Sequence, residues 1–215
     1  MAVPIKPEYG PTLGRLLAPR WRAASPLVRT LVRIGAMAIL LALIAAALTL
    51  ENSTFSHGGR VPFSFSYRDL HRVAADPGGY VKLQQREAHG ALQYSFAVNP
   101  LTLPPYSGEL SAYLPLYVSR YIDAVSRRYP GFELAGEGVT TVNNLPAYDV
   151  GYTTLVEGRE MYGRDVLVLP DSKGAREGVV IVMLAPPKAS KRVKGPLEVA
   201  TTGVLFKPFK SFSLD

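Results

Sequence analysis

The residue types that most often carry enzymatic or metal chemistry are few in this sequence and stand far apart. The chain has no cysteine, which excludes disulfides, thiolate nucleophiles and sulfur-ligated metal sites. Its three histidines, His57, His71 and His89, lack the paired spacing of a metal site, so we expect each in a linker, a strand end or a turn. The sequence therefore predicts neither a bound metal nor a cofactor.

The carboxylates and the short sequence motifs also give no sign of a catalytic site. Asp69, Asp149 and Asp165 are expected to pair with arginines in a sheet, since nothing in their spacing marks a general acid and base. The chain contains no phosphate-binding glycine loop, no HExxH helix and no GxSxG nucleophile turn. No catalytic residue is predicted, and an enzyme is the least favoured of three functional hypotheses.

Residues that could contact a partner lie in one loop and one basic cluster. A proline-rich loop carries Leu103, Tyr106 and Tyr113, and rigid, partly apolar loops make good docking surfaces. The same loop could equally cap one end of a sheet. The cluster around Lys191 and Arg192 could meet an acidic partner or the outer membrane surface, although short charge runs are usually solvated loops.

The net charge of +7 is unevenly distributed. Residues 1–33 hold six basic side chains and one acidic one, so the rest of the chain carries only +2. Binding to a nucleic acid requires a concentrated basic face, and a net charge of only +2 after residue 33 does not supply one. The charge distribution argues against a nucleic-acid partner.

An uncharged apolar run, Ile34 to Leu50, predicts a transmembrane helix over residues 31–50. Seventeen helical residues rise about 26 Å, close to the ~30 Å of a hydrocarbon core. Arg29 and Arg33 flank the run, and six basic residues precede it. Basic flanks stay in the cytoplasm, so we expect an inner N-terminus and the larger domain outside the plasma membrane.

Two readings of this segment remain open. It could be a signal peptide cleaved after Ala47, although it is longer than usual signal cores. Ala38, Ala42 and Ala46 lie four residues apart, and small residues at this spacing let two membrane helices pair as a homodimer. The tail before it, residues 1–30, is basic and rich in proline and is expected to be mostly disordered.

After a linker at 51–62, the pattern changes to one of strands and short turns over residues 63–215. Apolar and polar residues alternate in several runs, and one amphipathic helix is predicted from Leu114 to Tyr129. A second helix is expected from Pro196 to Phe206. The expected strands are 63–67, 81–85, 92–99, 139–142, 148–156, 161–169 and 179–184, the last of them continuously apolar and therefore central.

The order of these elements predicts an α+β domain, an antiparallel sheet of six or seven strands with one or two packed helices. It resembles the PsbP-like fold, which is shared with a nuclear Ran-binding protein. The resemblance covers roughly residues 63–215. It is carried by YSFAV (94–98), LPLYVSRYIDAVSRRY (114–129), NNLPAYDVGYTT (143–154), GRDVLVLP (163–170) and SFSL (211–214). It implies a mainly non-enzymatic protein and transfers no binding residue.

Three functional hypotheses follow. The preferred one is a membrane-tethered, non-catalytic domain that docks on another envelope protein. The second is a small-molecule or lipid carrier, which would require a pocket of about 300 Å³ or more with convergent polar groups. The third, an enzyme, would require titratable groups that converge in a cleft.

Overall fold

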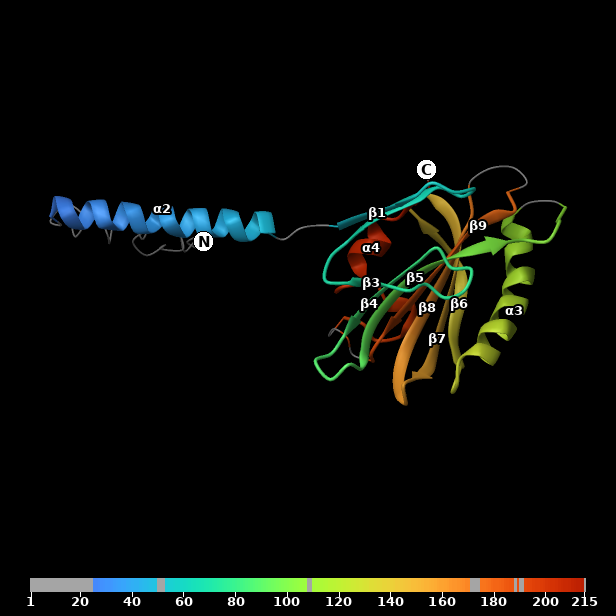
Figure 1. Cartoon of the computed structure of the whole chain (residues 1–215). Coiled ribbons are helices and arrows are strands. Elements are labelled where there is room, and N and C mark those ends of the chain that lie inside the picture. The colour runs from blue at the N-terminus through green and yellow to red at the C-terminus, as the bar shows by residue number, and fades with distance from the viewer. Residues whose placement is uncertain are drawn as a thin grey trace, which may run out of the picture. The chain divides into compact units, whose positions relative to one another are not determined.

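The computed structural model describes residues 25–49, 53–107, 110–170, 175–187, 189 and 192–214. The chain divides into two units, Met1–Glu51 and Asn52–Asp215. Figure 1 draws both, and each is described here by itself.

The first unit contains helix α2 (Pro26–Thr49), which covers nearly all of the predicted membrane segment. Its leucine and alanine are strong helix formers. Within the described side chains, no helix combines the length and apolar character needed to cross a membrane. Two residues of the predicted anchor, Arg33 and Ile34, are exposed on α2, whereas Leu50 and the side chains of Arg29 and Ala46 lie outside the described part.

The second unit is built on a seven-stranded antiparallel sheet with the order β3-β4-β5-β9-β8-β7-β6. A second sheet has three strands in the order β1-β2-β10. The strands are β1 (Ser53–His57), β2 (Phe63–Tyr67), β3 (His71–Val73), β4 (Val81–Arg86), β5 (Leu92–Thr102), β6 (Glu133–Val142), β7 (Leu145–Val156), β8 (Arg159–Val168), β9 (Glu177–Ala185) and β10 (Ser213–Leu214).

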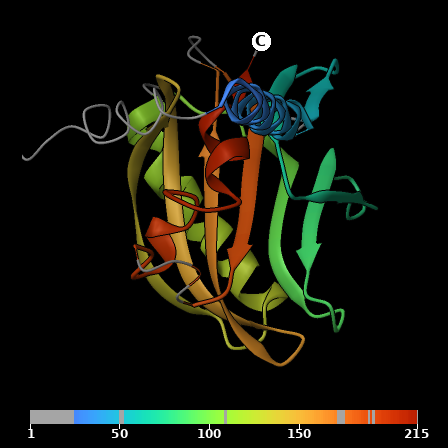
Figure 2. The ribbon, with the colours of Figure 1, turned by 90° about the vertical axis from the view of Figure 1, so that its left-hand side faces the viewer.

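The large sheet is covered on both faces. Helix α3 (Leu110–Arg128) packs on one face through Leu114, Val118 and Val125, which are buried against the sheet. The small sheet and the C-terminal segments η1 (Pro196–Glu198) and α4 (Phe206–Lys210) cover the other face. Figure 2 shows α3 behind the sheet and the C-terminal segments in front of it.

The central position predicted for the apolar strand is correct, because β9 lies fourth of seven and is buried from its second residue onward. Two tight hairpins set the register on one side of it. Asn143 and Asn144 have φ of 47° and 68°, and Glu157 and Gly158 have φ of 52° and 74°. Positive φ at both central residues is the conformation of the type I′ turn, which matches the twist of paired strands.

The α+β prediction is confirmed, with four differences of detail. The segment taken as a linker contributes β1, which pairs with β2. The short strand β3 was not predicted. The predicted second helix is wrong over most of its length, since only η1 and the first residue of α4 fall within it. Helix α3 begins at Leu110, so Pro115 lies inside the helix and not in its first turn.

Candidate functional site

A cleft of about 480 Å³ runs between α3 and the β3–β4 connection, over strands β5 and β9. We call it the α3 groove. Its lining comprises Asp76, Pro77, Gly78, Gly79, Asn99, Pro100, Tyr121, Arg128 and Val180. The volume lies within the range of about 300–1,000 Å³ that is typical of small-molecule sites.

The floor of the α3 groove carries a polar residue at a position that points toward the core. Asn99 follows Ala97 and precedes Leu101 on the same face of β5, and both neighbours are buried beneath α3. The Asn99 side chain is half-buried, and within the described residues it makes no hydrogen bond. Gly79 approaches it so closely that an added Cβ would lie 2.6 Å from Asn99 Oδ1.

Two charged residues at the rim of the α3 groove, Asp76 and Arg128, differ in whether they form an ion pair. Asp76 accepts a hydrogen bond from Lys82, with Nζ 2.8 Å from Oδ1, so its charge is partly neutralised. Arg128 is exposed, and none of its contacts among the described residues is an ion pair. The groove therefore offers a solvent-accessible side-chain amide and a guanidinium that forms no ion pair with the described residues.

Behind the groove, Tyr121 is held by a buried carboxylate. Its hydroxyl donates to Asp165 Oδ2 at 2.6 Å, and Tyr152 donates to Oδ1 at 3.0 Å. Burial raises the pKa of Asp165 to about 6, while the two tyrosine hydroxyls and Arg128 oppose this rise. Gly163, paired with Tyr152 across the sheet, leaves room for the ring, because an added Cβ would lie 2.2 Å from it.

This cluster is suited to fixing a side chain and not to proton transfer. Burial, and then the charge of Asp165, raise the pKa of Tyr121 and of Tyr152 well above 10, so both stay protonated donors. Asp165 is buried, and a general base must come within hydrogen-bond reach of the proton it abstracts. Within the described residues, no three metal-ligating side chains gather at one point. The cluster is a support for Tyr121 in the groove wall.

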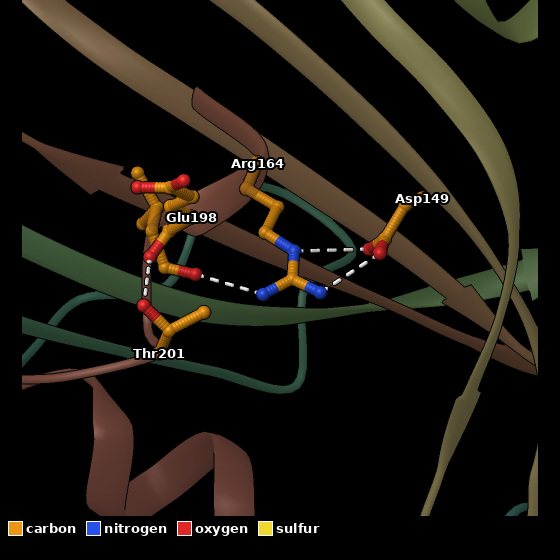
Figure 3. A network of polar contacts seen from close by, with 5 residues as sticks. Asp149, Arg164, Glu198 and Thr201 are labelled. Carbon is orange, nitrogen blue, oxygen red and sulfur yellow. Dashed lines mark hydrogen bonds and ion pairs between the residues drawn. The ribbon is translucent and has the colours of Figure 1, made fainter. Parts of the chain in front are cut away.

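A second polar network lies on the opposite face of the sheet (Figure 3). Arg164 donates from Nε and Nη2 to the two oxygens of Asp149, at 3.0 and 2.8 Å, and from Nη1 to the carbonyl of Val199 at 2.8 Å. Its guanidinium also lies 4.7 Å from the ring centre of Phe209. All of these partners belong to the sheet or to the C-terminal segments, so this network joins the two layers.

The predicted contact residues Tyr106 and Tyr113 lie together at one end of the sheet. Their rings stack with centroids 4.8 Å apart, and Tyr106 donates to the carbonyl of Ala175 at 2.8 Å. The backbone of Leu103 exchanges further hydrogen bonds with Arg176. We call this region the terminal surface and define it as Thr102, residues 104–107, Tyr113 and residues 175–177.

A cleft of about 650 Å³ opens beside the terminal surface. Thr102, Ala175 and Arg176 line it, together with Arg60, whose Nη1 lies 3.2 Å from Glu177 Oε1. This cleft combines charged and apolar groups and is open to solvent, as is the α3 groove.

Two of the predicted contact residues do not belong to the terminal surface. Leu103 is fully buried in the core beneath α3, so its inclusion as a surface contact is corrected. Arg192 follows the end of β9 at Ala185, whereas the terminal surface adjoins the other end of β9, at Glu177. Lys191 lies outside the described residues.

No protein-family model matches the chain, and no characterised protein matches its sequence. The solved structure of LpqN, which is involved in cell envelope biogenesis of Mycobacterium tuberculosis, is similar with a TM-score of 0.50 at 13% identity. That match covers 76% of this chain and 91% of LpqN.

Two further structures match with lower TM-scores. Cyanobacterial PsbP from Synechocystis sp. PCC 6803 gives 0.49 at 14% identity, covering 77% of this chain and 94% of that protein. The Saccharomyces cerevisiae Ran-binding protein Mog1p gives 0.47 at 12% identity, covering 77% and 96%. Identities this low concern the fold alone, and at that level the chain has the PsbP-like fold that its sequence predicts.

Proposed function

We propose that this protein is a non-catalytic binding domain of the cell envelope, tethered to the plasma membrane by residues 31–50 and docking on a partner protein through the terminal surface. The proposal is carried by the stacked pair Tyr106 and Tyr113. Tyrosine supplies a large contact area with few rotatable bonds, and aromatic residues are enriched at protein interfaces.

Hydrogen bonds within the domain hold the terminal surface in place. The Tyr106 hydroxyl donates to the carbonyl of Ala175, and Arg176 Nε donates to the carbonyl of Leu103 at 3.2 Å. Binding then orders few side chains, and each rotamer-rich side chain left free would cost about 0.5–1.5 kcal/mol on association. A pre-organised aromatic pair, formed by Tyr106 in the β5–α3 connection and Tyr113 in the first turn of α3, suits docking better than it suits catalysis.

The tether is supported by the sequence around α2. The run from Ile34 to Leu50 holds no charge, and Arg29 and Arg33 precede it. An arginine at the edge of a span costs much less than the ~3 kcal/mol it costs at the centre. Resistance of the full-length protein to alkaline extraction from membranes would support the tether, and a mature N-terminus at Leu48 would replace it with a cleaved signal.

Site-specific photo-crosslinking of the full-length protein in cells tests the docking surface. A photo-reactive residue in place of Tyr113 should give a discrete adduct, which Tyr106→Ala should weaken by removing the stacked ring. The matched control is the same residue in place of Arg127, which is exposed near the end of α3. Equal adducts from both positions, or an adduct insensitive to Tyr106→Ala, would contradict the proposal.

A second candidate function, binding of a small polar molecule, is favoured by the α3 groove. Its volume exceeds the threshold of about 300 Å³ given above, and Asn99 and Arg128 offer hydrogen-bond donors. These groups suit a polar ligand better than an acyl chain. Native mass spectrometry of the detergent-extracted protein should then reveal a bound molecule that Asn99→Leu removes.

A further inference from the structure

Strand β6 forms one edge of the large sheet and is exposed along almost its whole length. It spans ten residues, Glu133–Val142, and pairs with β7 on one side only. Within the described residues, no loop, cap or side-chain hydrogen bond reaches β6 beyond this ladder. Its outer backbone groups are therefore free to pair with another strand.

The opposite edge of the sheet is better protected than β6. Strand β3 has only three residues and contains Arg72. Natural sheets shield their edges with short strands, lysine, proline or bulges. Strand β6 is long, contains no lysine, arginine or proline, and carries only one bulge, between Leu134 and Gly136. The regular part of the edge, residues 136–142, remains available.

The two faces of this edge differ in a way that specifies a partner. On the α3 side, Leu134, Glu137 and Val139 are all exposed, and Val139 keeps 73% of its surface in solvent. On the other side stand Gly136 and Gly138, which have no side chains. Leu197 covers the first of these, whereas an added Cβ at Gly138 would meet nothing within 4 Å.

We propose that β6 binds an extended, basic segment of a partner protein by antiparallel strand addition. Directly opposed residues contact each other across a ladder, so each position of β6 selects its counterpart. Glu137 takes a lysine or arginine, Val139 takes a β-branched residue on the same face, and the open space at Gly138 takes an aromatic ring.

Charge distinguishes this occupant from a second copy of the chain. Strand β6 contains Glu133 and Glu137 and no basic residue. In two copies joined antiparallel with Glu137 opposite Glu137, the two carboxylates would face each other, and like charges in opposed positions are destabilising. The inference goes beyond the proposed docking function, because β6 shares no residue with the terminal surface.

Hydrogen exchange on the full-length protein in detergent micelles tests the proposal. The probe is a short synthetic peptide whose centre reads Val-Tyr-Lys, and the matched control peptide carries glutamate in place of lysine. The lysine peptide should slow amide exchange in residues 136–141. The control peptide should bind with about three- to tenfold lower affinity, because cross-strand pairs are worth roughly 0.2–1 kcal/mol each and its glutamate adds repulsion with Glu137.

A charge swap completes the test. Glu137 is exposed, so Glu137→Lys should leave the fold intact and reverse the preference, with the glutamate peptide binding better than the lysine peptide. Protection confined to β6 together with this reversal supports the proposal. No protection, protection at β3 instead, or equal affinity of the two peptides for either variant would overturn it.

Discussion

The buried carboxylate of Asp165 should make the domain more stable in weak acid, contrary to the usual acid lability of proteins. Burial raises its pKa to about 6 in the folded protein from 3.8 in the unfolded chain. Between these two values the folded state binds the proton and the unfolded state does not. The contribution to stability is therefore present below about pH 4 and is lost as the pH rises through 6.

The size of the effect follows from the two pKa values. One pKa unit corresponds to about 1.4 kcal/mol, so the full difference is worth about 3 kcal/mol in free energy of unfolding. Between pH 7 and pH 5 the same linkage yields about 1.3 kcal/mol. Other carboxylates oppose it at lower pH, because the pKa of Glu157 is lowered by the Leu92 amide and Arg86.

The assay is urea denaturation of the full-length protein in detergent at several pH values, for the native sequence and for Asp165→Asn. The variant cannot ionise at this position, so subtracting its stability cancels every other titrating group. The difference, native minus variant, should grow by about 1.3 kcal/mol from pH 7 to pH 5. Asp123→Asn, on the exposed side of α3, is the control and should leave the change in free energy of unfolding between pH 7 and pH 5 as it is in the native sequence. A difference that is constant, or that grows with pH, would refute the reasoning.

Three further variants probe the packing and the anchor. Gly163→Ala should destabilise the domain by about 1–3 kcal/mol in urea denaturation, because its methyl group would meet the ring of Tyr152, and an unchanged midpoint would contradict that contact. Arg164→Met should cost about 3–5 kcal/mol by leaving Asp149 buried and unpaired, and replacing both residues with apolar ones should recover most of the loss. Ala42→Leu should weaken self-association in a bilayer reporter assay, and an unchanged signal would remove the alanine stripe as a helix contact.

The parts of the fold that sequence predicts well are those fixed by local pattern. Alternation at period two identified β5 and β7. The Asn143-Asn144 pair between two strands is typical of a two-residue hairpin, whose type I′ turn needs positive φ at both residues. The continuous apolar run of β9 identified the central strand because only a strand covered on both faces can be apolar throughout.

The parts that sequence missed depend on contacts between distant segments. Strand β1 forms only because β2 lies beside it, and its residues read as a polar linker. The region after Pro196 has helical spacing, yet Ala200 and Gly203 adopt positive φ, which interrupts a helix. Tertiary packing therefore decides β1, whereas Gly203 inside the expected helix is a local signal against that helix.

The expected pairing of carboxylates with arginines in the sheet is found at one position. Asp149 pairs with Arg164 within the sheet. Asp69 pairs with its neighbour Arg68, but both lie in the connection between β2 and β3. The same prediction is wrong for Asp165, which is held by tyrosines. The available signal was a charged residue inside the buried run of β8, a position that demands buried partners.

Strand β8 thus carries two opposite charges in consecutive positions, and each points into a different layer. Arg164 reaches the C-terminal segments, and Asp165 reaches the tyrosines of α3 and β7. A shift of one residue along β7 would exchange the two faces, placing the carboxylate beside Asp149 and the guanidinium among hydroxyl donors. The pair therefore specifies one register between β7 and β8. An all-apolar β8 would not discriminate between registers in this way, because its side chains would fit either face.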